Sequence, residues 1–261
     1  MALPLGWHTD LAVLRLAGSA VEERPDHLLV RTPANPLYYW GNFVLVTDPD
    51  QVDEPRRWLE LFEQEFPDAG HRAIGLVAEP RDQDAWRVLD LELDHDDVLA
   101  TDRCPEPTEV PAGYLVRQLA EATEWDQSTG LRIEEFALDD RRESRFERNV
   151  TQARIALSRT GRVAGFGAFH GDRLVAELGI VDCGEAMARY QAVVTHADHR
   201  RRGLAGHLLG VAAAWAAERG ARAWVIVADD GSDASRLYRR RGFEPAAKGT
   251  RAQRKPSTER P

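Results

Sequence analysis

Apolar runs of strand length alternate with helical patterns in the second half of the chain. The predicted strands lie at 114–119, 163–171, 173–181, 187–195 and 221–228. A Gly171-Asp172 turn joins the second and third of these runs, which is typical of a β-hairpin. Residues 121–158 carry mixed helical signals. These patterns predict a sheet with helices inserted between its strands.

Two helices are predicted beyond the fourth strand. The first, at 203–219, has apolar residues at helical spacing, and Gly220 follows it as a glycine at C′ should. The second, at 233–241, can be N-capped by Ser232 or Asp233. Each helix is therefore predicted to follow a strand directly.

The first half of the chain shows the same order of elements. Its predicted strand, helix, strand, short helix and final strand lie at 38–47, 54–66, 71–79, 83–89 and 91–100. The order strand–helix–strand–helix–strand therefore occurs twice, although sequence identity between the halves is weak. Element order alone supports an internal repeat.

Two segments lack a periodic apolar pattern. Residues 101–113 hold three prolines and a glycine, which predicts a linker. Residues 248–261 are polar, basic and proline-bearing, which predicts a disordered tail. The predicted domains are therefore 1–105 and 113–247, followed by that tail.

Composition narrows the class of protein. The formal net charge is −9 and the isoelectric point is near 5.4, which argues against a nucleic-acid-binding surface. No apolar run reaches the ~18 residues that span a bilayer, and the N-terminus lacks the pattern of a secretory signal. The two cysteines, Cys104 and Cys183, have no partner at metal-ligand spacing. We expect a cytoplasmic protein without a nucleic-acid, membrane or metal partner.

The basic turn at 200–206 is Arg-Arg-Arg-Gly-Leu-Ala-Gly and opens the first predicted helix. At a helix N-terminus, backbone N–H groups without intrahelical partners and the helix dipole together attract phosphate. Gly203, Ala205 and Gly206 leave room for a diphosphate to approach the backbone. Taken alone, the segment is equally compatible with a glycine-punctuated turn whose arginines are solvated.

The second predicted helix carries the pair Leu237-Tyr238 and is followed by Gly242-Phe243. Helical periodicity directs Leu237 and Tyr238 towards the sheet and the arginines of the helix towards solvent. Tyr238 is then either a core residue or a proton donor to a leaving thiolate, for which a phenol is chemically able.

The combination of these motifs resembles the GNAT superfamily of acyltransferases. The family signature R/Q-x-x-G-x-G/A is met by Arg200, Gly203 and Ala205, and the later L-Y pair and G-F ending are also present. The match covers residues 191–243 and, with the upstream hairpin, most of 114–247. The resemblance implies an α+β fold with a mixed sheet. It implies a complete GNAT domain in the second half and, with the repeated element order, a degenerate GNAT-like lobe in the first.

The resemblance also implies where acetyl-CoA binds and reacts. In the family, the coenzyme enters between two parallel strands that splay apart, here 187–195 and 221–228. The implied coenzyme contacts are Val193, Val194, Thr195, Arg200, Arg201, Arg202, Gly203, Leu204, Ala205, Gly206, Ser232 and Tyr238. Tyr238 is the implied general acid beside the coenzyme sulfur. The amine acceptor attacks the thioester directly, so that no Ser or Cys nucleophile is needed.

The chain departs from the family in two places. An asparagine that many members carry before the L-Y helix is absent, and Ser232 is its expected substitute. A glutamate base that some members place on the central strand is replaced by Arg189. Some group must nevertheless accept a proton from the attacking ammonium.

Several residues are candidates for that proton acceptor. Glu177, inside the apolar run 173–181, is the carboxylate we expect to act as the base, unless it lies at a solvated sheet edge. His196 and His199 have suitable intrinsic basicity but flank the phosphate turn, which favours a surface role. Tyr190 and Gln191 offer a relay through water.

The first half lacks a comparable anion-binding turn. Residues 47–55 are acidic and glycine-free, so they would repel phosphate, and we expect no coenzyme there. Our hypothesis is that this lobe packs against the second half and contributes to the acceptor pocket. The aromatic residues Tyr38, Tyr39, Trp40 and Phe43 would line such a pocket or, as is commoner, form an ordinary core.

The sequence thus favours an N-acetyltransferase that moves an acetyl group from acetyl-CoA to a primary amine. A non-catalytic acyl-CoA-binding sensor or interaction module of the same fold is the alternative, since the base is uncertain. A nucleotide-binding protein of another fold is disfavoured because no G-x-G-x-x-G or G-K-[ST] motif is present. The acceptor, the acyl-chain preference and the oligomeric state, a homodimer included, are left open.

Overall fold

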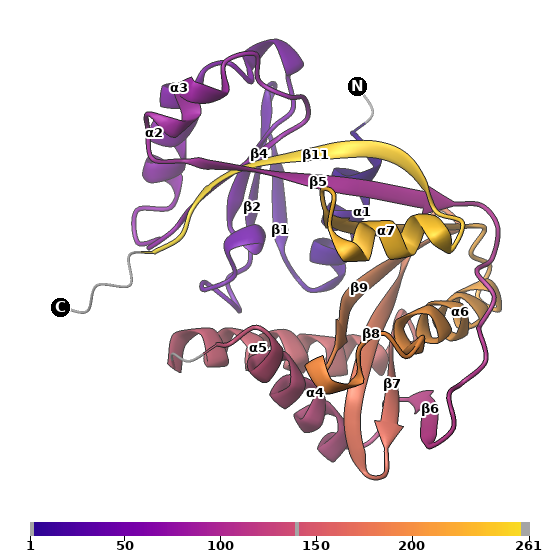
Figure 1. Cartoon of the computed structure of the whole chain (residues 1–261). Helices are drawn as coiled ribbons and strands as arrows, with labels where there is room; N and C mark the ends of the chain where they lie inside the picture. Colours follow the sequence, from indigo (N-terminus) through magenta and orange to yellow (C-terminus); the bar gives the residue numbers. More distant parts are fainter. Residues whose placement is uncertain (1–2, 139–140, 257–261) are drawn as a thin grey trace. The chain divides into compact units, whose positions relative to one another are not determined.

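A computed structural model describes residues 3–138 and 141–256 (Figure 1). The chain divides into two compact units. The N-terminal unit comprises Met1–Val98, Ala228–Ser232 and Ala246–Pro261, and the C-terminal unit comprises Leu99–Val227 and Asp233–Pro245. Both units are therefore assembled from segments that are distant in the sequence.

The N-terminal unit contains strands in the order β1-β2-β3-β4-β11-β5. Its elements are α1 (Leu5–Leu16), β1 (Ala20–Glu23), β2 (His27–Arg31), η1 (Tyr39–Gly41), β3 (Phe43–Val46), η2 (Pro49–Gln51), α2 (Pro55–Glu65), β4 (Arg72–Leu76), α3 (Gln83–Arg87), β5 (Glu92–Thr101) and β11 (Glu244–Arg254). Strands β3 and β4 are parallel, and the pairs β1–β2, β2–β3 and β4–β11 are antiparallel. The predicted order from the strand at 38–47 to that at 91–100 is confirmed, and α1, β1 and β2 precede it.

The core of this unit lies around β3, whose four residues are all buried. Helix α2 contributes Trp58 and Phe62, which are one turn apart and fully buried. Burial of side chains of this size is worth about 1.5–3 kcal/mol each. The helical spacing of these aromatic residues therefore explains why residues 55–65 form a helix on this core.

The aromatic cluster near residue 40 belongs to the same core. Trp40 packs edge-on to Phe43, with ring centroids 5.6 Å apart, and both rings contact Trp7. The cation over this cluster comes from the chain itself, since the Arg251 guanidinium lies 5.0 Å from the Trp40 centroid. Of the two expectations for these residues, the structure supports the core.

The predicted strand at 38–47 is shorter than expected. Residues 39–41 form the turn η1, and β3 begins only at Phe43. The cause is the buried Asn42 side chain, whose amide donates to the carbonyl of Tyr38 at 2.8 Å and whose oxygen accepts from the N–H of Thr32 at 2.9 Å. These bonds hold the chain in a turn in place of extended strand.

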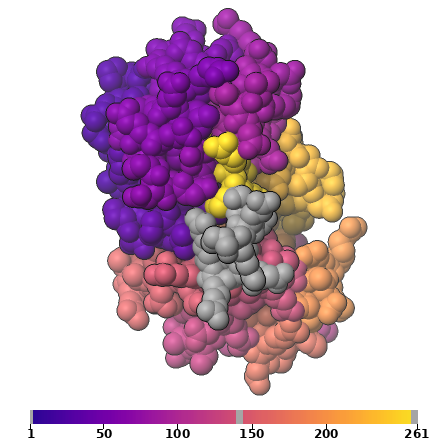
Figure 2. All heavy atoms as spheres, turned by 90° about the vertical axis from the view of Figure 1, so that its left-hand side faces the viewer, coloured from indigo at the N-terminus to yellow at the C-terminus, as the bar shows by residue number. Residues whose placement is uncertain are grey.

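The predicted disordered tail at 248–261 is wrong for residues 248–254. These residues continue β11, which pairs with β4 from Thr250↔Leu76 to Arg254↔Arg72. Figure 2 shows the yellow end of the chain set among the purple atoms of the N-terminal unit. The segment is polar because much of it is only half-buried, while Ala252 is fully buried. Residues 257–261 lie outside the described part.

The C-terminal unit contains strands in the order β10-β9-β8-β7-β6. Its elements are β6 (Tyr114–Gln118), α4 (Ala122–Glu135), α5 (Arg141–Ser158), β7 (Val163–His170), β8 (Arg173–Gly184), β9 (Met187–Thr195), η3 (Ala197–His199), α6 (Leu204–Ala217), β10 (Ala223–Asp229) and α7 (Asp233–Arg240). Strands β9 and β10 are parallel, and the remaining pairs are antiparallel. The predicted strand at 187–195 coincides with β9, and the other predicted strands and the two late helices are confirmed within a few residues.

Helices cover both faces of this sheet. Glu177 of β8 faces Arg154 of α5, whereas Tyr190 of β9 donates its hydroxyl to the carbonyl of Leu209 in α6. Figure 1 shows α6 on one side of β8 and β9, with α4 and α5 on the other. Within residues 3–138 and 141–256, no helix has both the length and the apolar character needed to cross a membrane.

The predicted linker is an ordered part of the C-terminal unit. Residues 102–112 form no helix or strand, yet they pack along α6. A Cβ at Gly210 would lie 2.1 Å from the Pro107 nitrogen, so glycine is required for this approach. His207 in the same helix is hydrogen-bonded to the carbonyl of Thr108.

Candidate active site

Strands β9 and β10 separate after a short paired stretch. Among the described residues, their pairing runs from Ala223↔Met187 to Val225↔Arg189. Beyond Arg189, β9 continues to Thr195 and pairs with β8 alone. The parallel strands therefore part where the sequence predicts a coenzyme cleft.

A β-bulge reshapes β9 at this opening. Glu177 pairs with Val194 but Gly179 pairs with Gln191, so β9 has one residue more than β8 between these positions. Ala192 has φ 55°, which is uncommon for a residue with a side chain. Bulges re-aim the backbone at functional sites, and here the re-aimed residues begin at Val193.

The turn between β9 and α6 has the geometry of an anion site. Arg201 has φ 62° and Gly203 has φ 80°. The first backbone hydrogen bond of α6 runs from the N–H of His207 to the carbonyl of Gly203. The N–H groups of Leu204, Ala205 and Gly206 precede that bond and have no intrahelical acceptor. Together with the helix dipole, they favour a phosphate at this end.

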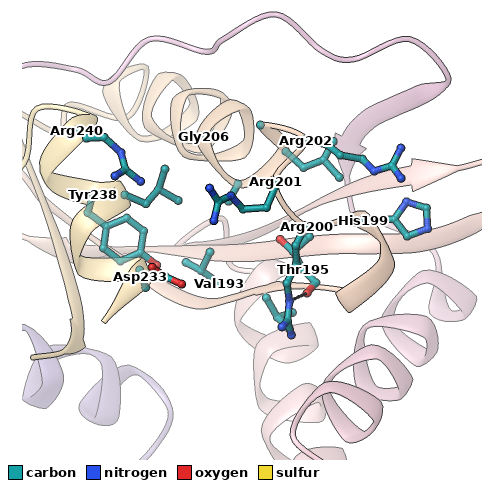
Figure 3. A pocket seen from close by; sticks show the side chains of 16 residues that line it. Val193, Thr195, His199, Arg200, Arg201, Arg202, Gly206, Asp233, Tyr238 and Arg240 are labelled. Carbon is teal, nitrogen blue, oxygen red and sulfur yellow. Dashed lines mark hydrogen bonds between the residues drawn. The ribbon is translucent and has the colours of Figure 1, made fainter. Parts of the chain in front are cut away.

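A pocket of about 450 Å³ lies against this turn (Figure 3). It is built entirely within the C-terminal unit, from β9, the turn, α6 and α7. The lining residues are Val193, Val194, Thr195, His199, Arg200, Arg201, Arg202, Gly203, Leu204, Ala205, Gly206, Asp233, Ala234, Leu237, Tyr238 and Arg240. The structure thus brings together every predicted coenzyme contact except Ser232.

The three consecutive arginines of the turn point in different directions. Arg201 reaches towards the middle of the pocket, whereas Arg202 points away from Tyr238 (Figure 3). Arg202 donates to the carbonyl of Asp198 at 3.3 Å, and Arg200 donates to the carbonyl of Thr195 at 3.1 Å. Arg201 is therefore the turn arginine best placed to meet a ligand in the pocket.

Tyr238 lies on α7 at the wall of the pocket and is 4 % exposed. Burial raises the pKa of its phenol well above the ordinary value, because the charged phenolate would be poorly solvated. The hydroxyl therefore stays protonated at physiological pH. The protonated phenol can donate to a thiolate formed within the pocket, although its raised pKa makes it a weaker acid than an exposed phenol.

Glu177 lies in a different environment from the pocket. Its side chain is fully buried, and its Oε1 is 3.3 Å from Arg154 and 3.9 Å from Arg132. Arg132 also donates to Glu147 at 2.7 Å. Glu177 is not among the residues that line the pocket, although its strand partner Val194 is.

The comparison with known families identifies the fold of this site. A model described as "Acetyltransferase (GNAT) family" matches residues 119–243. Residues 119–243 are a GNAT domain. The signature residues of this family lie in the turn and on α7.

Solved structures share the GNAT architecture over almost the whole chain. A conserved protein from Staphylococcus epidermidis has a TM-score of 0.74 at 13% identity, covering 90% of this chain and 93% of its own. A GCN5-related N-acetyltransferase from Kribbella flavida has a TM-score of 0.68 at 17% identity, with 97% and 96% covered. A tandem GNAT protein from the clavulanic acid biosynthesis pathway has a TM-score of 0.57 at 14% identity, with 97% and 89% covered. No curated protein sequence matches the chain.

These likenesses confirm the predicted fold class, a mixed α/β sheet of the GNAT type with a second lobe ahead of the GNAT domain. At such identities they concern the fold alone. The roles of individual residues in this GNAT domain must therefore be argued from the geometry of its own pocket.

The remaining predicted residues lie outside the pocket of the GNAT domain. Ser232 belongs to the N-terminal unit, and its N–H donates to the carbonyl of Asp229 at 3.1 Å. Arg189, which replaces the family glutamate, is buried and donates to the carbonyl of Tyr190. Cys183 is half-buried, and its thiol donates to the carbonyl of Val181 at 3.8 Å. Within the described residues, His, Cys, Asp and Glu side chains form no group that could hold a metal ion.

The two histidines near the turn differ in their surroundings. His196 is buried, its Nδ1 accepts from the N–H of Asp198 at 3.2 Å, and its Nε2 lies 3.1 Å from Glu134 and 2.9 Å from Arg173. His199 lines the pocket, and its Nδ1 is 2.8 Å from the Tyr114 hydroxyl. Burial, with nearby His170, lowers the pKa of His199. His199 is thus a neutral imidazole at physiological pH.

Two charged residues of α7 line the pocket without having been predicted. Arg240 points into the pocket from the side opposite to the turn (Figure 3). Asp233 bonds to Arg236 at 2.6 Å, and this bond, with the charges of Arg236, Arg201 and Arg240, lowers the pKa of its carboxyl. The helical periodicity places the arginines of α7 towards solvent, and only the fold shows that Arg240 shares the pocket with Arg201.

Proposed function

We propose that the protein is an N-acetyltransferase that moves an acetyl group from acetyl-CoA to a primary amine. The observation that carries the proposal is the cationic pocket at the start of α6, which joins exposed helix N–H groups to the opened edge of β9. Arg201 and Arg240 supply positive charge, and Asp233 is the only carboxylate among the described residues that line the pocket. A diphosphate with an extended acyl-thioester arm matches this arrangement of charge and shape.

The coenzyme contacts follow from the order of residues around the pocket. The N–H groups of Leu204, Ala205 and Gly206 would hold the pyrophosphate. The backbone of Val193, Val194 and Thr195 would bond the pantetheine arm and the thioester carbonyl. The acyl carbon would then lie near the bulge at Ala192, where β9 has parted from β10.

The chemistry is a direct transfer. The amine nitrogen attacks the thioester carbonyl carbon, the C–S bond breaks, and the leaving thiolate takes the proton of the Tyr238 hydroxyl. The nitrogen loses a proton to solvent, and the phenolate is reprotonated. Glu177 is assigned no role as base, because two arginines engage it away from the pocket. We expect the neutral fraction of the amine to react, so that the pH profile follows the pKa of the acceptor.

The test is thiol release from acetyl-CoA in the presence of a panel of amines. Tyr238→Phe should lower kcat by about 100-fold, the lower end of general acid catalysis, with little change in the affinity for CoA. Tyr190→Phe is the matched control, because it removes the hydroxyl of a buried tyrosine that does not line the pocket. An unchanged kcat for Tyr238→Phe would exclude Tyr238 as the acid.

The same experiment separates the enzyme from a non-catalytic acyl-CoA sensor. A sensor would bind CoA tightly in calorimetry and release no thiol with any amine of the panel. A protein that binds neither CoA nor acetyl-CoA would contradict both functions. We also propose a cytoplasmic location, where acetyl-CoA is available.

A further inference from the structure

The last residue of α4, Glu135, forms two hydrogen bonds to the turn between β9 and α6. The Glu135 Oε1 accepts from the N–H of Ala197 at 2.8 Å, and its Oε2 accepts from the Arg200 guanidinium. The Glu135 side chain is only 6% exposed. This carboxylate is therefore held in place beside residues that are more than 60 positions away in the sequence.

Arg200 completes the connection. Its Nε donates to the carbonyl of Thr195 at 3.1 Å, the bond drawn in Figure 3. The Arg200 side chain runs away from the middle of the pocket, towards the helices below the sheet, whereas Arg201 runs into it. Glu135 and Arg200 thus hold the backbone of the turn at two points, the carbonyl of Thr195 and the N–H of Ala197.

The backbone of this turn must be restrained by its surroundings. Arg201 has a positive φ, which costs a residue with a side chain roughly 1–2 kcal/mol and persists only when its surroundings enforce it. The N–H groups at the start of α6 can meet a diphosphate only while this turn keeps its shape. Hydrogen bonds to an ionised carboxylate are about twice as strong as hydrogen bonds between neutral groups.

We infer that Glu135 is a positioning residue for the coenzyme, acting through Arg200 and the N–H of Ala197, and that Arg200 itself does not contact the phosphates. This inference rests on the proposed function. In this role the signature arginine, Arg200, shapes the turn. Arg201 and the N–H groups at the start of α6 then bind the negative charge of the phosphates. The role of Glu135 also makes α4 a determinant of coenzyme affinity.

Whether Glu135→Gln raises or lowers the affinity for CoA decides between this role and direct phosphate contact by Arg200. If Arg200 bound phosphate, Glu135→Gln would release the guanidinium, and CoA would bind more tightly. If Arg200 shapes the turn, Glu135→Gln and Arg200→Gln weaken CoA binding alike, and the double variant is little worse than either. The control Asp126→Asn removes one negative charge from the same helix, at an exposed residue, and keeps both Glu135 bonds.

Calorimetry with CoA measures these affinities, and circular dichroism confirms that each variant is folded. We expect Glu135→Gln and Arg200→Gln each to weaken binding about 5- to 20-fold, within the range for losing a charged hydrogen bond. The double variant should fall within about twofold of the weaker single variant, since coupled positions are not additive. Asp126→Asn should stay within about twofold of wild type.

A second readout distinguishes positioning from general loss of structure. Acetyl-pantetheine carries the thioester and the arm but lacks the diphosphate, so KM for this donor should not change in Glu135→Gln, while KM for acetyl-CoA rises. The inference would be overturned if KM rose equally for both donors in Glu135→Gln, or if this variant bound CoA more tightly than wild type. It would also be overturned if the loss of affinity in the double variant equalled the product of the two single losses. Wild-type protein that binds no CoA would instead overturn the proposed function, and coupling between Glu135 and Arg200 would then be measured from unfolding free energies.

Discussion

At the scale of the residue, the chemistry of this protein depends on where the chain keeps or neutralises charge. Tyr238 is buried and keeps its proton, Arg201 projects into the pocket, and Glu177 is buried between two guanidinium groups. A glutamate in an apolar strand looks the same in sequence whether it is a base or a structural ion. Its partners, Arg132 and Arg154, decide which it is.

Glu177 should be a determinant of stability. Glu177→Gln keeps the shape of the side chain but removes the buried negative charge that faces Arg132 and Arg154. We expect the free energy of unfolding in urea to fall by about 3 kcal/mol, as when one partner of a buried ion pair is lost. The folded fraction should retain its kcat. A large loss of kcat with unchanged stability would restore Glu177 as the base.

Burial of Tyr238 should also make stability depend on alkaline pH. The folded pKa lies above the unfolded value near 10, so above that pH the unfolded chain loses a proton that the native state retains. The free energy of unfolding should then fall by about 1.4 kcal/mol per pH unit for this group. Tyr238→Phe should flatten the slope by that amount. Tyr190→Phe should do likewise, because burial raises its pKa as well.

At the scale of the element, the pocket is formed by an irregular strand, a tight turn and two helix ends. Strand β9 carries the bulge at Ala192, the turn carries two residues with positive φ, and α6 presents its N-terminus. The 102–112 segment packs along α6 and contacts His207 near that end. The position of α6 therefore depends on a segment whose sequence predicts only a linker.

Gly210 is the point where that segment approaches α6 most closely. In Gly210→Ala the new Cβ would lie 2.1 Å from the Pro107 nitrogen, so the segment must move. We expect a loss of about 1–3 kcal/mol in unfolding free energy, as for overpacked cores. Gly130→Ala in α4 is the matched control, because nothing lies within 4 Å of the place that its new methyl group would take. It should raise stability by up to about 1 kcal/mol.

At the scale of the whole molecule, the order of the chain does not coincide with the two units. The N-terminal unit contains the end of the chain, because β11 pairs with β4. Arg251 of β11 bonds to Asp10 at 3.2 Å and lies 3.0 Å from Asp96, both within that unit. The C-terminal residues are therefore part of the fold of the N-terminal unit.

Truncation distinguishes this arrangement from a disordered tail. A chain that ends at residue 247 loses every pair between β11 and β4 and leaves Asp10 and Asp96 without Arg251. We expect it to lose at least about 3 kcal/mol of stability, with faster hydrogen exchange at the amides of β4. A chain that ends at residue 254 keeps all these contacts and should match the full-length protein in both measurements.

The sequence by itself determined the order of elements, the GNAT motif and most of the pocket. Helical spacing, hairpin turns and the signature from Arg200 to Ala205 are local patterns, and local patterns are legible without a fold. The tertiary structure alone decided that Arg200 meets Glu135, that Glu177 lies between Arg132 and Arg154, and that β11 joins β4. Each of these contacts joins residues that are at least 23 positions apart. Local sequence patterns do not show such contacts, because only the packing of the folded chain brings the two residues together.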